Sequence, residues 1–356
     1  MQDESKKDSK LKDRSEKGLT YADAGVDIDA ESTVISELVK QFKKYPVEGL
    51  GKPIELPGHF TGLVEFGDYA LTLCTDGVGT KIMIANELKK WDTVGIDCIA
   101  MNVNDTICIG AKPVAFVDYL AMEEPSKDIV AEIGKGLAKG AELAGINIIG
   151  GETATLKGII NGVDLAGTCL GFIERDKIIT GKKIVEGDAI VGLPSSGIHS
   201  NGLTLARKII ELKQMGYNAP FPGSPDNASI GEVLLTPTKI YVKDILGVLP
   251  DLELHGLANI TGGGLKNIMR LKEDVHFKIT DPLPVPEIFK SLKDWGKVST
   301  HEMYQTFNMG LGFCIVLPQA DANKLVNRLK DSPGAKIIGY VEKGKGLSVP
   351  DLDLKF

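Results

Sequence analysis

Short apolar runs alternate with segments of helical periodicity in the first half of the chain. The pattern predicts strands at residues 69–74 (YALTLC), 114–121 and 163–173, and helices at 81–89, 93–109 and 126–144. In the last of these helices the apolar residues recur every three or four positions, as in an amphipathic helix. Because few parallel crossover units are evident, we expect an α+β fold (mixed α/β) with a mixed sheet.

The second half has its own alternation of strands and helices, which predicts a mixed sheet flanked by helices. Strands are expected at residues 189–193, 254–260, 311–317 and 336–341, and helices at 203–215, 230–249, 265–271, 285–295 and 319–330. The polar segment 176–188 (DKIITGKKIVEGD) separates the two halves. We therefore expect two domains, at residues 19–175 and 176–356.

Residues 1–18 hold five acids and six bases, with Leu11 as the only sizeable aliphatic side chain besides the initiator methionine. Such a segment buries too little apolar area to offset the entropy lost on ordering. We expect a mobile tail; a charged first helix is the alternative.

Composition narrows the class of protein. The 356 residues are 43% hydrophobic and 25% charged, which is typical of a soluble globular enzyme. The net charge of −7 predicts no binding to nucleic acid or to anionic membranes, and no apolar run is long enough to span a bilayer. We expect a cytoplasmic protein whose thiols are reduced and buried, because none of the cysteines has CxxC or zinc-ligand spacing: Cys74, Cys98, Cys108, Cys169 and Cys314.

Neither of the two common nucleotide-binding motifs, GxxxxGK[ST] and GxGxxG, is present. Instead, acidic residues recur beside glycines at the predicted ends of elements. The segments are DAGVDID at 23–29, TDGVGTK at 75–81, Asp97 with NVND at 102–105, and GGET at 150–153. Each has a structural alternative, because DGVG and paired glycines also form turns and the acids also suit helix ends.

The combination of these segments favours binding of a metal-bridged nucleotide. A triphosphate cannot lie beside carboxylates unless cations separate them, and Mg²⁺ commonly joins one or two carboxylates to substrate phosphates. Lys81, at a predicted helix start, is placed to contact a phosphate together with nearby amides.

The second half offers a different chemistry. Residues 193–202 (LPSSGIHSNG) run from a strand into a helix, where small hydroxyls, an amide and glycines suit an anion site. His199 is a candidate proton carrier there, and a capping or hydrogen-bonding role is the alternative. Ser196 lacks the G-x-S-x-G context of a hydrolase nucleophile. The turn TGGG at 261–264 is a second candidate phosphate cradle, and a flexible turn is its alternative.

Taken in order, eight segments resemble the aminoimidazole ribonucleotide synthetase (phosphoribosylformylglycinamidine cyclo-ligase) family. They are TYADAGVDIDA at 20–30, TDGVGTK at 75–81, WDTVGIDCIAMNVND at 91–105, GGETA at 150–154, PSSGIHSNG at 194–202, LLTPTKIYVK at 234–243, ITGGG at 260–264 and EMYQTFNMG at 302–310. The resemblance implies conversion of formylglycinamidine ribonucleotide and ATP into aminoimidazole ribonucleotide, ADP and phosphate. It also implies Mg²⁺, stimulation by K⁺, and a homodimer whose amino-terminal sheets pair into a barrel.

The resemblance also implies roles for individual residues. Those on the ATP and metal side are Asp27, Asp76, Gly77, Gly79, Thr80, Asn104 and Gly151, with Asp76, Asp105 and Glu152 as metal ligands. Those on the substrate side are Ser196, Gly197, Ser200, Asn201, Gly262, Gly263 and Gly264. Three residues are predicted to be catalytic: His199, Asp97 and Lys81.

The chain departs from the family pattern at two loops. After GGETA it continues Thr155-Leu156-Lys157-Gly158 where the family usually has Glu-Met-Pro-Gly, and residues 49–66 are less rich in glycine than in bacterial relatives. These departures affect contacts made by loops. Another ATP-using member of the superfamily, such as a thiamine-phosphate kinase, and a non-catalytic nucleotide-binding subunit are the competing hypotheses.

Overall fold

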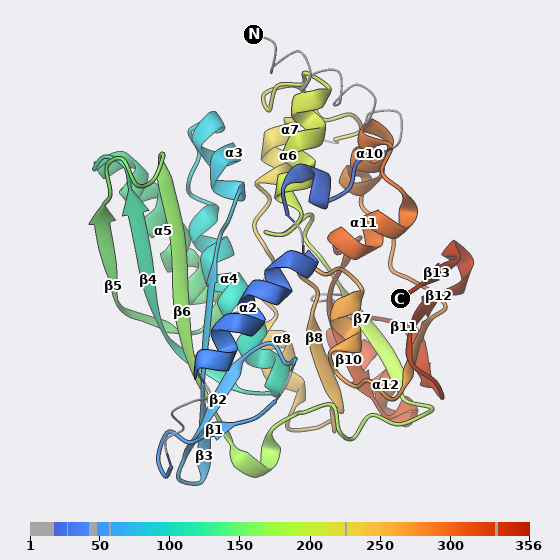
Figure 1. The fold of residues 1–356 in the computed structure, drawn as a ribbon. Coiled ribbons are helices and arrows are strands. Elements are labelled where there is room, and N and C mark those ends of the chain that lie inside the picture. The colour runs from blue at the N-terminus through green and yellow to red at the C-terminus, as the bar shows by residue number, and fades with distance from the viewer. Residues whose placement is uncertain (1–17, 27, 43–47, 57, 225, 332–333) are drawn as a thin grey trace.

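In a computed structural model, two mixed sheets form the framework of the chain (Figure 1). The structure describes residues 18–26, 28–42, 48–56, 58–224, 226–331 and 334–356. Both the predicted tail, up to residue 17, and Asp27 lie outside these ranges. Among the described residues, no helix combines the length and apolar character needed to cross a bilayer.

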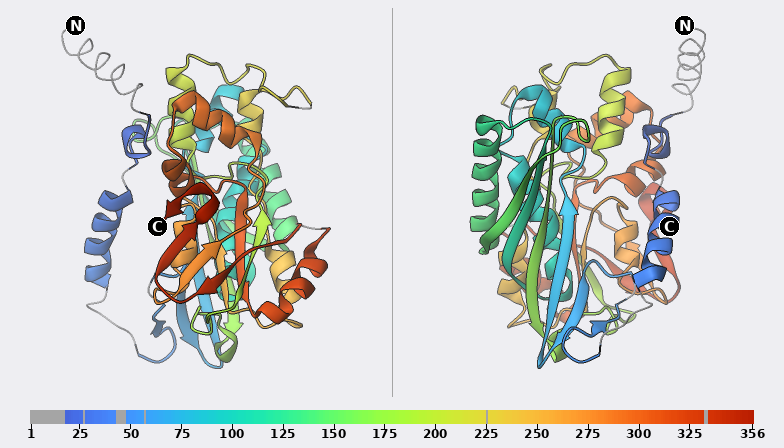
Figure 2. Two further views of the ribbon diagram at one scale, coloured as in Figure 1. Left: turned by 90° about the vertical axis from the view of Figure 1, so that its right-hand side faces the viewer. Right: turned by 60° about the vertical axis from the view of Figure 1, so that its left-hand side comes forward.

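The first sheet has six strands in the order β1-β2-β3-β6-β4-β5. Its strands are β1 (Pro53–Ile54), β2 (Gly62–Phe66), β3 (Tyr69–Gly77), β4 (Lys112–Met122), β5 (Asn147–Thr155) and β6 (Val163–Glu174). Only β4 and β5 pair in parallel. The helices α3 (Lys81–Leu88), α4 (Val94–Thr106) and α5 (Lys127–Ala144) lie behind one face (Figure 2). The other face is not covered by a helix of the described residues and is called the bare face below.

The second sheet has seven strands in the order β13-β12-β9-β11-β7-β10-β8. Its strands are β7 (Ala189–Pro194), β8 (Gly256–Asn259), β9 (His276–Ile279), β10 (Leu311–Leu317), β11 (Lys336–Glu342), β12 (Gly346–Val349) and β13 (Leu354–Lys355). The helices are α6 (Leu203–Leu212), α7 (Ile230–Leu234), α8 (Val242–Val248), α9 (Lys266–Met269), α10 (Glu287–Gly296), α11 (Thr300–Thr306) and α12 (Gln319–Leu329). The predicted mixed architecture is confirmed in both halves.

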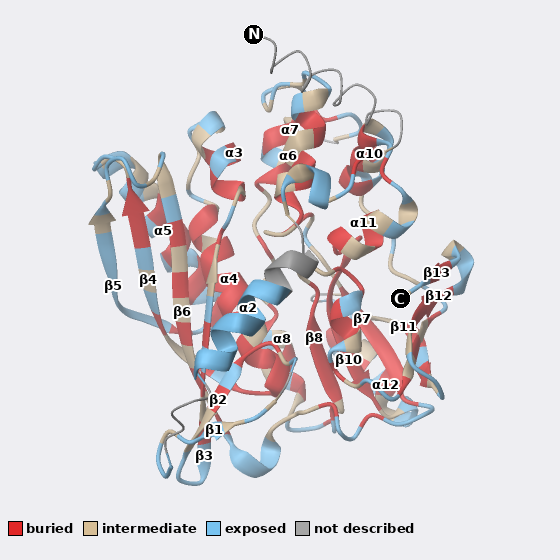
Figure 3. Cartoon of the chain, in the orientation of Figure 1, coloured by how far each residue is buried: buried red, intermediate tan, exposed pale blue. Residues whose placement is uncertain are grey.

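Helix α4 is the central helix of the fold. Nearly all its residues are buried, because it packs on β3 and β6 of the first sheet and against β8 of the second (Figure 3). The larger of two hydrophobic clusters among the described residues runs from the first half into the second across this contact. The segment 176–188 connects β6 to β7, and whether it separates independently folding domains stays a prediction.

Two predicted elements are wrong. The single helix expected at 230–249 is interrupted, because α7 ends at Leu234 and α8 begins at Val242. Pro237 explains the break, since it lacks an amide proton and disfavours helical geometry at Thr236. The motif GGET, expected after a short apolar run at the end of an element, lies inside β5, which pairs with β4 at the edge of the sheet. Helix α2 (Ile28–Phe42) and α11 were not predicted.

Candidate active site

Two of the predicted metal ligands come together where the halves meet. Asp76 lies at the end of β3, where it accepts a 2.7 Å hydrogen bond from the backbone N–H of Gly77. Asp105 lies in the last turn of α4, and its Oδ1 accepts a 2.8 Å bond from Nδ2 of Asn259 on β8. Burial raises the pKa of both carboxyls, that of Asp105 to about 7, and the Asp76 charge adds to the shift at Asp105.

This acid pair fits a cation. Two desolvated carboxylates, one of which raises the pKa of the other, are stabilised when a positive charge lies between them, and carboxylate oxygens are ligands that Mg²⁺ prefers. Arg270 is the positive group that acts on Asp105 in the structure, and it lowers the pKa of that carboxyl. Within the described ranges, no three His, Cys, Asp or Glu side chains gather at one place as a metal site.

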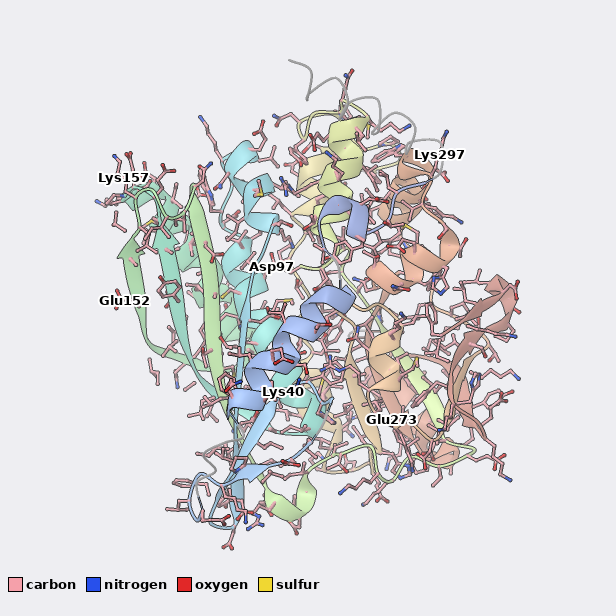
Figure 4. All side chains as sticks on the ribbon, viewed as in Figure 1. Lys40, Asp97, Glu152, Lys157, Glu273 and Lys297 are labelled. Carbon is pink, nitrogen blue, oxygen red and sulfur yellow. The ribbon has the colours of Figure 1, made fainter. Side chains whose placement is uncertain are left out.

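Glu152, the third predicted ligand, lies elsewhere in the chain. It pairs in register with Tyr119 of β4, on the exposed face of the first sheet. On β3 this face carries Thr75, so the neighbouring Asp76 points to the opposite face. Figure 4 shows Glu152 at the outer edge of the molecule and Asp97 at its middle. A Cβ at Gly151 would lie 2.4 Å from Oδ1 of Asp118, so this glycine is needed for close packing of β5 on β4.

Asp97 and Lys81 form a buried ion pair. Nζ of Lys81 donates to Oδ1 of Asp97 at 2.8 Å and to the carbonyl of Thr236 at 2.7 Å. Oδ1 of Asp97 also accepts from the backbone N–H and hydroxyl of Thr238, at 2.7 and 2.6 Å. Both side chains are fully buried, so they face a loop of the second half rather than an open surface. Their catalytic role stays a prediction.

Asn104 binds the same loop about two turns further along α4. Its Oδ1 accepts from the backbone N–H of Tyr241 at 3.0 Å, and its Nδ2 donates to the carbonyl of Lys239 at 2.7 Å. The side-chain amide therefore pairs with the backbone on both sides of Ile240, much as a strand neighbour would. Segment 236–241, which the sequence motif LLTPTKIYVK contains, is thus held by Asp97 and Asn104 of α4 and by Lys81 of α3.

Segment 236–241 in turn supports the turn at 195–202. Oγ of Ser196 donates to the carbonyl of Pro237 at 2.6 Å, and Oγ of Ser200 lies 3.1 Å from Oγ1 of Thr238. The hydroxyl of Tyr241 donates to the carbonyl of Pro194 at 2.8 Å. The turn leads into α6, whose first N–H groups are an anion-binding feature.

His199 is a buried residue of this turn, and its side chain bonds back to the backbone of Ser196. It is 2% exposed with φ of 60°, and its Nε2 accepts a 3.2 Å bond from the backbone N–H of Ser196. Burial lowers its pKa to about 3, with smaller contributions from Lys81 and Lys239. The imidazole is therefore neutral at pH 7 with its proton on Nδ1, which favours the hydrogen-bonding alternative.

The TGGG turn lies against the 195–202 turn. A Cβ at Gly262 would lie 3.0 Å from Oδ1 of Asn201, whose Nδ2 contacts Sδ of Met101 on α4 at 3.9 Å. Gly263 lies beside Asn267, and Gly264 has φ of 52°. The two predicted phosphate cradles are therefore neighbours.

Two glycines, one at the end of β3 and one just after it, shape the start of α3. Gly77 lies against the carbonyl of Leu165, and Gly79 has φ of 67° just before the helix. Oγ1 of Thr80 lies 3.0 Å from Oγ1 of Thr204 on α6. This turn therefore reaches the second half near the 195–202 turn.

Four residues of the site were not predicted from the sequence. Asn259 pairs with Asp105, and Nδ2 of Asn308 donates to the carbonyl of Gly197 at 2.9 Å. Lys239 is half-buried and lowers the pKa of His199. Arg270 donates to the carbonyls of Gly58 and His59 and covers the Phe60 ring, with Cζ 4.0 Å from its centroid. Lys239 and Asn308 lie within the motifs TPTKIY and TFNMG, whereas Asn259 directly precedes ITGGG and Arg270 lies outside the motifs. No single motif shows which residue its members contact.

Two family models match this chain. Residues 58–173 match the N-terminal domain of AIR synthase related proteins, and residues 185–351 match the C-terminal domain. The chain belongs to the AIR synthase related family.

Among its curated relatives are two proteins named phosphoribosylformylglycinamidine cyclo-ligase. That of Methanosarcina barkeri is 53% identical over 339 residues, 95% of this chain and 99% of the relative. That of Methanococcoides burtonii is 50% identical over 340 residues, 96% of this chain and 99% of the relative.

Solved structures show the same fold at low identity. A chain of a HypE–HypF complex is 20% identical with a TM-score of 0.64, covering 89% of this chain and 95% of that one. Thiamine-monophosphate kinase from Stenotrophomonas maltophilia is 18% identical with a TM-score of 0.61, covering 89% of this chain and 95% of that one. These likenesses support the fold alone.

Proposed function

We propose that this protein is a phosphoribosylformylglycinamidine cyclo-ligase of purine biosynthesis, an ATP-dependent enzyme that forms a carbon–nitrogen bond. It closes the imidazole ring of formylglycinamidine ribonucleotide to give aminoimidazole ribonucleotide, ADP and phosphate. The observation that carries the proposal is identity of 50% or more along nearly the whole chain to relatives that bear this name. The solved neighbours under 25% identity do not favour another member of the superfamily, because they match in fold only.

Asp76 and Asp105 are the residues that would hold a divalent cation, with Asn259 orienting the Asp105 carboxylate. Bound Mg²⁺ would offset the charge of the ATP phosphates beside these acids. Asp105 has to be ionised for this role, and the approach of a cation favours its ionised form. Stimulation by K⁺ is part of the proposal and rests on the resemblance alone.

The 195–202 and TGGG turns form the substrate side of the proposed site. The N–H groups that open α6 would face a bound anion, and the half-buried ammonium of Lys239 adds a positive charge nearby. Asn308 fixes the carbonyl of Gly197, so the turn is preorganised rather than flexible. The ribose phosphate of formylglycinamidine ribonucleotide has the charge and size for this place.

The proposed reaction has two bond-forming events. The formyl oxygen of the substrate takes the γ-phosphoryl group of ATP, which releases ADP and converts that oxygen into part of a phosphate leaving group. A substrate nitrogen then attacks the formyl carbon, the carbon–oxygen bond breaks and phosphate departs. The chain's contribution is to hold both substrates in line across the α4 junction and to exclude water.

The assay is direct. The full-length protein is mixed with formylglycinamidine ribonucleotide, ATP and Mg²⁺, and the diazotisable aminoimidazole product is measured together with ADP and phosphate. We expect all three products in equal amounts, and none when ATP is omitted. ATP-dependent binding without aminoimidazole would instead support the non-catalytic hypothesis, and phosphorylation of thiamine monophosphate would support a kinase.

We further propose that the protein acts as a cytoplasmic homodimer built on the bare face of the first sheet. Apolar side chains on that face are exposed in one chain: Phe66, Tyr69, Leu73, Val117 and Tyr119. Contiguous apolar surface of this kind marks protein–protein interfaces. A shared barrel would also remove the free edge of β5 and bring the partner's sheet over Glu152.

A further inference from the structure

Thr238 occupies an unusual position between the two halves of the chain. It is 4% exposed, and its hydroxyl lies 2.6 Å from Oδ1 of Asp97 on α4 and 3.1 Å from Oγ of Ser200 in the second half. One hydroxyl therefore connects the helix that carries Asp105 to the turn that opens α6. Asp97 in turn accepts a hydrogen bond from Lys81, and Ser200 lies three residues before the first residue of α6.

The direction of these bonds follows from the number of protons. A threonine hydroxyl has one proton, and Asp97, as a carboxylate, can only accept. Thr238 therefore donates to Asp97, and Ser200 must donate its own proton to Thr238. The same holds for Ser196, whose hydroxyl proton goes to the carbonyl of Pro237.

Both serine protons thus point into segment 236–238 and away from any ligand of the turn. In this state neither hydroxyl can donate to a phosphate, although the sequence motif suggests that both would. The remaining donors of the turn are backbone N–H groups, such as those at the start of α6, and the amide of Asn201.

We propose that Thr238 is a positioning residue which couples the nucleotide side of the site to the substrate-phosphate side. It holds the 195–202 turn in register with α4, so a change at Asp105 and Asp97 on nucleotide binding reaches the backbone donors of the turn. The proposal rests on the proposed function for the identity of the two ligands. It predicts that each ligand strengthens binding of the other by the same factor, since coupling between two sites is reciprocal.

Three variants separate this role from a purely structural one. Thr238→Val keeps the shape and removes both bonds, whereas Thr238→Ser keeps the hydroxyl. Ser200→Ala breaks only the bond to the turn and leaves every donor to Asp97 in place, so it tests coupling even if Thr238→Val folds poorly. Thr72→Val is the matched control, because it removes a fully buried threonine hydroxyl that pairs with Thr61 inside the first half.

The first measurement is calorimetric binding of formylglycinamidine ribonucleotide to the full-length protein, with and without Mg²⁺ and a non-hydrolysable ATP analogue. In the wild type and in Thr72→Val we expect the analogue to tighten binding by about 5-fold or more. In Thr238→Val and Ser200→Ala the factor should fall to within about 2-fold of unity, and Thr238→Ser should restore it. An unchanged factor in both variants, or no coupling in the wild type, would overturn the proposal.

The second measurement needs no assumption about the substrate. Mg²⁺ and the ATP analogue alone should slow amide hydrogen exchange in a peptide covering residues 195–202 of the wild type, and should not do so in Thr238→Val or Ser200→Ala. Equal protection in all three proteins contradicts the inference. Protection in the wild type without any ring closure in the assay supports the coupling while refuting the proposed function, so the two failures are distinguishable.

Discussion

Nζ of Lys81 and Oδ1 of Asp97 lie 2.8 Å apart with both side chains fully buried, and they join α3 to α4 at the centre of the molecule. The ion pair is not isolated, because Lys81 also donates to Thr236 and Asp97 also accepts from Thr238. Desolvating two charges is costly, so such a pair stabilises the fold only while its hydrogen bonds are complete. One oxygen of Asp97, Oδ2, is buried with no hydrogen-bond partner among the described residues, which makes the carboxylate sensitive to loss of any donor.

Replacing Lys81 by methionine should therefore destabilise the protein strongly. Removal of one partner leaves Asp97 as an uncompensated buried charge, at a cost of about 3–5 kcal/mol in the free energy of unfolding. Urea denaturation at pH 7 measures this, and the double variant Lys81→Met with Asp97→Asn should recover part of the loss. If Lys81 instead served mainly as a phosphate contact, the single variant would keep wild-type stability and raise only the KM for ATP.

Replacing Asp105 by asparagine should lower turnover by about 100-fold or more while the protein stays folded. The amide keeps an oxygen for Asn259 but loses the charge that would bind a cation, and losses of this size follow removal of metal-site interactions. Steady-state kinetics across a Mg²⁺ titration measures the effect. Asp118→Asn is the control, because Asp118 is a partly buried carboxyl of β4 whose pKa burial also raises. Near wild-type turnover in Asp105→Asn would remove this residue from the site.

Glu152→Gln, measured in the same series, tests the third predicted ligand. In one chain Glu152 lies on the opposite face of the sheet from the acid pair, so an effect on turnover has to come through assembly with a second copy or through the sheet itself. Loss of turnover with unchanged dimerisation would support a ligand role. Wild-type turnover would assign Glu152 to the surface of the strand.

The local pattern of the sequence was sufficient for most elements and for the acid pair. Strand β10 has the predicted bounds, because a continuous apolar run between turn residues is typical of a buried strand. Asp76 and Asp105 were both singled out, and they do lie together. Their proximity follows from one helix packing on the strand that precedes it, a contact of short sequence separation.

Contacts of long sequence separation could not be derived in this way. Asn259 is 154 residues from Asp105, and Tyr241 is 137 residues from Asn104. The hydrophobic periodicity of the sequence does not identify such partners, because they depend on how the two sheets pack on α4. The misplacement of GGET has the same origin, because an exposed polar strand such as β5 is defined by its neighbour β4 rather than by its own hydrophobicity.

His199 should make the stability of the protein depend on pH below neutrality. Its pKa is lowered from 6.5 to about 3 in the folded state. As the pH falls below 6.5 the unfolded chain binds a proton that the folded side chain does not, so the free energy of unfolding decreases. Asparagine tolerates the positive φ of this position and does not titrate. The difference in stability between His199→Asn and wild type should therefore change by about 1.4 kcal/mol per pH unit between pH 6 and 4. Parallel curves would show that His199 is not held neutral.

Gly264 should be the most demanding glycine of the TGGG turn. Its φ of 52° disfavours other residues, and a Cβ would lie 2.0 Å from the carbonyl oxygen of Tyr304. Gly264→Ala should cost about 2–5 kcal/mol and displace the turn from Asn201. Gly247→Ala is the control, because this exposed glycine of α8 has nothing within 4 Å of its Cβ position and alanine should stabilise the helix by up to about 1 kcal/mol. Thermal unfolding of both variants and the wild type measures these changes in stability.

A charge on the bare face of the first sheet should separate the proposed dimer. Leu73 is 60% exposed in one chain, on the same face as Tyr119, and Leu73→Lys would bury an unpaired ammonium if a second copy covers it. Sedimentation equilibrium should give twice the mass of one chain for the wild type and the single mass for Leu73→Lys. Val185→Lys, a substitution of a 54% exposed side chain outside both sheets, should remain dimeric. A wild-type protein that sediments as one chain, or a dimer that survives Leu73→Lys, would place the interface elsewhere, and then the exposed position of Glu152 would need no partner to explain it.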